Sequence, residues 1–207
     1  MATVSGELVA QLDRPQICCC EYLSSGVCAY RRVAAGGELT WLPIDSVPAP
    51  VLCDGDEGGV FWCMCNSFSI RLRSTESAGA LALLEVVAPV GAAPPLHVHH
   101  REAEVFYLLE GAMIYRAGDD AFELAPGSSI YLPKDVPHAF RVIGRRPARF
   151  LALTAPGGIE ALYEQLGRPP ARDGLPDKPT AEEIGSWLRA AETYGLEICG
   201  PPLPELA

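Results

Sequence analysis

The chain has 207 residues, which suits one domain of ordinary size with an extension but not two domains with separate large cores. Hydrophobic residues make up 49% and charged residues 20%, a composition typical of globular rather than disordered proteins. The net charge of -10 argues against a nucleic-acid partner, because nonspecific affinity for phosphates comes mainly from Lys and Arg. Gly (20) and Pro (19) are frequent, which favours many short elements joined by turns over a helical bundle.

The sequence shows no recognisable targeting or membrane segment. The first thirty residues contain acidic side chains and no apolar core behind a basic start, unlike a signal peptide. The longest apolar stretch, residues 80–90, is far shorter than the roughly 20 residues that a membrane helix needs. We therefore expect a cytoplasmic protein with no membrane partner. In that reducing compartment the eight cysteines are expected to be free thiols.

The first stretch, residues 1–59, carries isolated apolar clusters broken by glycines and prolines. Its last residues, from Asp54 onward, contain three glycines and three acidic residues and are expected to form a loop before the main domain. We expect an N-terminal extension of unknown role. It could supply a strand to a partner or cover an exposed sheet edge.

Residues 60–155 have the sequence pattern of an all-β domain. Short apolar runs recur about every ten residues, with turn residues between them and no helical pattern. This spacing predicts an antiparallel sandwich or barrel, the jelly roll among them. The expected strands are 68–72, 81–88, 105–109, 112–116, 121–124, 129–132, 139–143 and 149–154.

The apolar period changes to 3.6 in residues 156–207, which we expect to form a helical cap and tail. Apolar side chains recur at helical spacing over 159–166, and Gly167 follows as a C-terminal cap. Thr180 and Glu183 form the sequence pattern of a capping box, which opens a second helix ending near Gly195. Both helices are expected to pack against the outside or one mouth of the β domain.

The histidines have the pattern of a metal site. His97 and His99 are two residues apart, so in an extended segment both imidazoles point to the same face, whereas His100 points away. Glu104 opens the next strand, and His138 begins a later strand that antiparallel pairing could bring alongside. Three neutral imidazoles and a carboxylate are a typical donor set for a divalent transition metal.

The spacing around these residues resembles the first motif of the cupin superfamily. Gly91 is followed after five residues by His97, then by His99, after four more residues by Glu104 and after six more by Gly111. The segments 97–102 and 104–111 are similar to single-domain cupins related to quercetin 2,3-dioxygenase.

A second stretch resembles the second cupin motif, with two departures. Gly127, Pro133 and His138 stand at the motif spacing. Asp135 replaces the turn glycine, and Val142 replaces the usual asparagine. Neither position is a metal ligand in the family, so the departures concern turn geometry and strand-end hydrogen bonding.

The resemblance implies a double-stranded β-helix (the cupin jelly roll) whose interior holds one divalent metal and the substrate. The implied ligands are His97, His99, Glu104 and His138. Fe, Ni and Mn suit an open octahedral site best, and Co, Cu and Zn also accept this donor set.

The implied activity is that of a quercetinase-like dioxygenase. Such cupins bind a hydroxylated aromatic through a deprotonated oxygen on the metal and add O2 to it. Glu104 would be both ligand and catalytic base. By strand parity, Phe106, Leu108 and Phe140 share the ligand faces and are the expected substrate-binding residues, although they also suit plain core packing.

Two other functions fit the same motifs, because one fold hosts many activities. One is a metal-assisted cyclase or isomerase that needs no O2. The other is a non-catalytic cupin that binds a small molecule without converting it. In each case we expect a small-molecule partner, joined by O2 for the oxygenase, and a homodimer.

Overall fold

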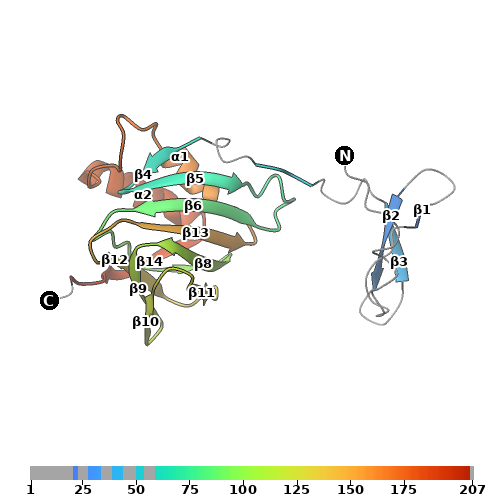
Figure 1. Ribbon diagram of the computed structural model, residues 1–207, viewed down its shortest axis with the longest axis horizontal. Coiled ribbons are helices and arrows are strands. Elements are labelled where there is room, and N and C mark those ends of the chain that lie inside the picture. Colours follow the sequence, from blue (N-terminus) through green and yellow to red (C-terminus); the bar gives the residue numbers. More distant parts are fainter. Residues whose placement is uncertain (1–20, 23–27, 34–38, 44–49, 54–58, 206–207) are drawn as a thin grey trace. The chain divides into compact units, whose positions relative to one another are not determined.

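The computed structural model describes residues 21–22, 28–33, 39–43, 50–53 and 59–205, and its contacts divide the chain between Pro50 and Val51 into two units. The described part of the first unit is an antiparallel three-stranded sheet (Figure 1) of β1 (Glu21–Tyr22), β2 (Cys28–Val33) and β3 (Leu39–Pro43). The proposed extension 1–59 lies largely outside the described residues. Its strand-supplying role stays a prediction.

The second unit consists of two antiparallel sheets and two helices (Figure 1). One sheet has, in spatial order, β10 (Asp120–Leu124), β9 (Ala112–Ala117), β12 (His138–Ile143), β7 (Pro95–His99) and β14 (Leu196–Pro202). The other has β11 (Ser129–Leu132), β8 (Ala103–Glu110), β13 (Ala148–Ala155), β6 (Ala82–Ala88), β5 (Asn66–Leu72) and β4 (Phe61–Cys63). The all-β jelly-roll prediction is confirmed.

Alternating burial along the strands creates the core between the two sheets. In β6 and β13 every second side chain is buried and the side chains between them are partly exposed, the pattern of strands with one face inward. The inward residues from both sheets meet in one apolar cluster that includes Leu84, Met113, Tyr115 and Phe150. This interior is the space into which the predicted ligand strands also project.

Strand β14 is an element that the sequence did not predict. It pairs antiparallel with β7 at the edge of its sheet, with Leu196 opposite His99 and Ile198 opposite His97. Gly200 and Pro202 lie in this strand and hide its apolar alternation. Proline is tolerated there because an edge strand does not need every N–H for pairing.

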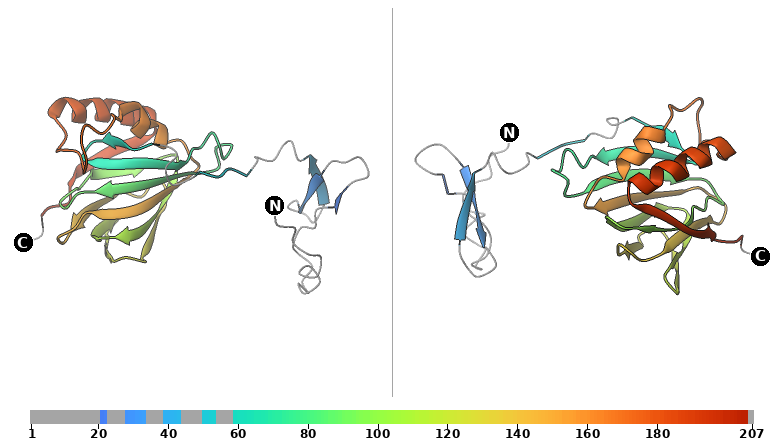
Figure 2. Two further views of the ribbon diagram at one scale, coloured as in Figure 1. Left: turned by 45° about the horizontal axis from the view of Figure 1, so that its top comes forward. Right: turned by 180° about the vertical axis from the view of Figure 1, so that it is seen from behind.

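The two helices form as predicted and lie on the same side of the sheets (Figure 2): α1 (Glu160–Leu166) contacts β4, and α2 (Ala181–Thr193) contacts β14. The capping box is present, since the Glu183 N–H donates to Thr180 Oγ1 at 3.2 Å and the Thr180 N–H donates to Glu183 Oε2 at 2.7 Å. Neither helix, nor any other in the described residues, has the length and apolar character to cross a membrane.

Gly111, between β8 and β9, is required for two reasons. Its φ of +86° is unfavourable for other residues, and a Cβ there would lie 2.6 Å from the Pro147 carbonyl oxygen and 2.7 Å from Ala148 Cα. Gly127 has a similar φ of +90° with no atom within 4 Å of such a Cβ. A substitution at Gly127 therefore measures the free-energy cost of the positive φ alone, without the steric clash that is present at Gly111.

Gly111→Ala is accordingly expected to destabilise the fold more than Gly127→Ala. The conformational cost common to both is about 1–2 kcal/mol, and overpacking against the 147–148 backbone adds roughly 1–3 kcal/mol for Gly111 alone. Urea unfolding of the two variants and the parent measures the difference. Equal losses in the two variants would show that the backbone contact contributes nothing.

Candidate metal centre

The four predicted ligands come from three strands on the two sheets. His97 and His99 lie on β7, His138 begins β12 beside it, and Glu104 lies on β8 in the opposite sheet. His138 stands directly opposite His97 in the antiparallel register. Because opposite residues share a face, this pairing brings the third histidine to the predicted pair.

The donor atoms of these residues form one compact group. One ligand atom from each of His97, His99, Glu104 and His138 lies within 4.8 Å of the others. The residues His99, Glu104 and His138 are only 2%, 5% and 2% exposed, and His97 is the more accessible member. Glu104 Oε2 lies 3.1 Å from His138 Nε2 and 3.4 Å from His99 Nε2.

The backbone orients two of the imidazoles in the same way. His97 Nδ1 lies 2.7 Å from the carbonyl oxygen of Pro95, and His138 Nδ1 lies 2.9 Å from that of Val136. A carbonyl only accepts, so each Nδ1 donates to it, and each Nε2 is the ring nitrogen that is left to face the cluster. These are the tautomers that metal-binding histidines adopt.

Glu102 orients the third imidazole, and the sequence analysis did not identify it. Its Oε1 lies 2.8 Å from His99 Nδ1, and the side chain is buried, with the residue only 3% exposed. This carboxylate–histidine pair fixes the Nε2 of His99 toward the cluster. The sequence does show a carboxylate three residues after His99. Whether it reaches the imidazole depends on how the chain turns between β7 and β8, which the sequence pattern does not specify.

Glu102→Ala is therefore expected to weaken metal binding by about 10–100-fold without removing a ligand. Glu197→Ala is the matched control, because Glu197 Oε2 accepts from the exposed His100 at 3.0 Å and not from a cluster residue. Competition with a chromophoric chelator measures the affinity of both variants. Equal affinities would contradict the orienting role of Glu102.

The charges in the cluster suit a cation. Burial raises the pKa of Glu104, but the neighbouring His99 and His138 outweigh it and bring the pKa to about 2, so the carboxylate is ionised. Burial and then His138 and His99 lower the pKa of His97 to about 4, which keeps this imidazole neutral. Burial lowers the pKa of His99, yet Glu104 and Glu102 raise it overall. Because a metal binds only the deprotonated imidazole nitrogen, a bound metal ion would displace the proton of His99.

The donor set thus fits a divalent transition metal. It provides imidazole nitrogens oriented through their Nδ1 atoms and an ionised carboxylate, and three of its four residues are buried. Among the described residues this is the one group of three or more His, Cys, Asp or Glu whose donor atoms meet in this way.

The predicted substrate-binding residues lie in the same interior. Leu108 is fully buried, whereas Phe106 and Phe140 are each 8% exposed, and their ring centroids are 6.4 Å apart. All three share the inward face with the ligands, as parity predicts. Their contact with a substrate stays a prediction.

His100 lies on the surface, one residue beyond the end of β7. Its side chain is 46% exposed, and its Nδ1 lies 2.7 Å from Asp135 Oδ1. Asp135 occupies the turn position that is glycine in the cupin motif, and its φ is +64°. Its N–H donates to the His99 carbonyl at 2.9 Å. The turn thus keeps its geometry without glycine and supports the ligand strand.

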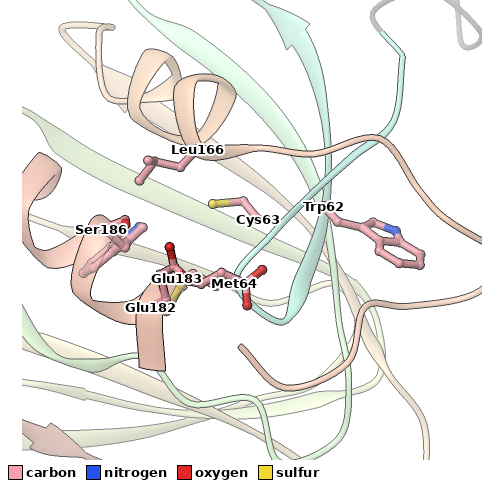
Figure 3. Close-up of a pocket in the computed structure, with 8 residues that line it drawn as sticks. Trp62, Cys63, Met64, Leu166, Glu182, Glu183 and Ser186 are labelled. Atoms are coloured by element: carbon pink, nitrogen blue, oxygen red, sulfur yellow. The ribbon is translucent and has the colours of Figure 1, made fainter. Parts of the chain in front are cut away.

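A separate pocket lies between α2 and the hairpin of β4 and β5 (Figure 3). It holds about 190 Å³, and none of the four cluster residues lines it. Its wall residues are Trp62, Cys63, Met64, Leu166, Glu182, Glu183, Ser186 and Trp187. It is therefore no part of the candidate metal centre.

Comparisons with known proteins find sequence relatives of this chain. An uncharacterized protein of Methanocaldococcus jannaschii is 35% identical over 75 residues, which cover 36% of this chain and 60% of that protein. Quercetin 2,3-dioxygenase of Bacillus subtilis is 25% identical over 164 residues, which cover 79% of this chain and 48% of that enzyme. The chain thus spans 60% of the length of the first relative and 48% of the second, less than two thirds of either.

An RmlC-like cupin from Shewanella frigidimarina, a solved structure, is 16% identical with a TM-score of 0.47, and the match covers 55% of this chain and 96% of that one. The family model described as the cupin domain matches residues 84–154, a range that contains all four residues of the cluster. This match assigns residues 84–154, which lie within the jelly-roll sheets, to the cupin domain family.

Proposed function

We propose that this protein is a mononuclear metal-dependent oxygenase, a dioxygenase that acts on a small hydroxylated aromatic or enolizable compound. The observation that carries the proposal is the convergence of three oriented imidazoles and an ionised carboxylate between the sheets. The similarity to quercetin 2,3-dioxygenase over 79% of this chain supports the choice of oxygen chemistry.

His97, His99, Glu104 and His138 would hold the metal, with Fe, Ni or Mn as the proposed ion. Such an ion supplies Lewis acidity, which lowers the pKa of a coordinated hydroxyl group as it does for bound water. A substrate hydroxyl can then lose its proton near neutral pH.

Glu104 is the proposed acceptor of that proton. Its carboxylate is ionised and buried, and Oε2 faces the space that the imidazole Nε2 atoms also face. A base must lie within hydrogen-bond reach of the proton it removes, and a ligand of the same metal meets that requirement. Phe106 and Phe140 would hold the apolar part of the substrate and exclude water from the reacting atoms.

Metal analysis of the purified protein, followed by O2 uptake with quercetin after loading Fe, Ni or Mn, tests this function. Metal-dependent O2 consumption, with both atoms of labelled O2 in the product, is the expected result. Turnover of an enolizable compound without O2 would identify a cyclase or isomerase instead. Saturable binding without a product under either condition would identify a binding protein.

A further inference from the structure

Two side-chain hydroxyls in the interior of the second unit have no hydrogen-bond partner among the described residues. They are the Tyr115 hydroxyl and Thr154 Oγ1, in residues that are 0% and 1% exposed. A buried polar group without a partner costs about 1–3 kcal/mol, so nearly all such groups in proteins are paired. Two of them in one core suggest that their partner arrives from outside the chain.

Thr154 lies beside the candidate metal centre. It stands directly opposite Glu104 in the pairing of β13 with β8, and residues opposite each other share a face with Cβ atoms about 4.5–5.5 Å apart. On its other side, in the pairing with β6, Thr154 faces the small side chain of Ala82. The buried Thr154 side chain is therefore on the inward face, beside the side chain of Glu104.

Tyr115 approaches from the other sheet. It stands opposite Phe140 in the pairing of β9 with β12, while His138 stands opposite Ala117, two residues farther along β9. Tyr115 is thus a diagonal neighbour of His138 on the inward face, a separation of about 7–8 Å. Its ring packs against Phe106 and Phe140 with centroids 5.4 and 5.5 Å apart, so it shares the proposed substrate space.

We propose that Thr154 and Tyr115 recognise the substrate by hydrogen bonds to oxygen atoms other than the one at the metal. The substrate class that follows is a compact compound with oxygen atoms on neighbouring carbons, such as a catechol or an α-hydroxy ketone. This inference rests on the proposed function. An apolar barrel with a few placed polar groups discriminates strongly against analogues that lack the matching oxygen, because the protein hydroxyl would stay unpaired.

Thr154→Val and Tyr115→Phe test the inference, because each removes one hydroxyl and nearly keeps the shape of the side chain. Titration calorimetry of Co-loaded protein compares catechol with phenol, which lacks the second oxygen. The preference for catechol over phenol is expected to fall roughly two- to tenfold in each variant, the size of one neutral hydrogen bond. The phenol affinity and the bound metal should stay the same.

Thermal unfolding of the same variants gives a readout that does not depend on a ligand. Removing an unpaired buried hydroxyl should leave Tm unchanged or raise it. Tyr131→Phe is the matched control, because Tyr131 is 63% exposed and should affect neither the catechol preference nor Tm.

Three outcomes would overturn the inference. An unchanged catechol preference in either variant rejects the role of that residue and leaves the proposed function intact. A lower Tm in either variant would show that its hydroxyl is already paired in the free protein, for instance by a buried water molecule. Failure of Co-loaded parent protein to bind either compound would reject the proposed function, and the recognition role with it.

Discussion

Replacing His97, His99 or His138 with alanine is expected to leave the purified protein with little or no bound metal. Each imidazole is one of only four protein donors in a buried cluster. Loss of a residue that only orients a ligand costs about 10–100-fold in affinity, and loss of the ligand itself should cost more. Metal content per protein, measured by elemental mass spectrometry after equilibration with Fe, Ni or Mn, reports the result.

His100→Ala is the control for this series. The His100 side chain is 46% exposed and is engaged by Asp135 and Glu197, neither of which belongs to the cluster. This variant should keep the metal content of the parent, and circular dichroism should show that all four variants are folded. If His100→Ala lost the metal while His99→Ala retained it, the assignment of ligands by strand parity would be wrong.

Glu104→Gln is expected to lower turnover per bound metal by roughly 10²–10⁴-fold, the usual loss when a general base is removed. Glutamine keeps an oxygen donor of similar size at the position that lies 3.1 Å from His138 Nε2, but it cannot accept the substrate proton. If Glu104 were only a ligand, metal affinity would fall modestly and turnover of the loaded protein would not change.

The measurement requires metal occupancy and O2 uptake on the same samples, because an empty site would imitate the loss of a base. Glu110→Gln is a suitable control, since Glu110 lies on the same strand but pairs with Arg149 at the surface. Equal turnover per bound metal in Glu104→Gln and the parent would reject the general-base role. Glu104 would then be a metal ligand only.

The local sequence was sufficient to predict most of the strands, both helices and the common face of His97 and His99. Strand-length apolar runs bounded by turn residues predicted the β domain, and helical spacing with the capping box at Thr180 predicted α2. The two-residue spacing of His97 and His99 predicted that both side chains lie on the same face of an extended strand. These features could be predicted because they depend on backbone periods of 2 and 3.6 and on contacts between residues close in the chain.

The tertiary structure decided which of these strands meet. Strand β14 pairs with β7, which carries two of the proposed ligands, although its own sequence predicted only an irregular tail. Glu102 reaches His99 only because the chain turns between β7 and β8. Thr154 comes to lie opposite Glu104 from 50 positions away in the sequence. Register between distant strands is set by how both sheets bury their inward faces together, and no local pattern contains that information.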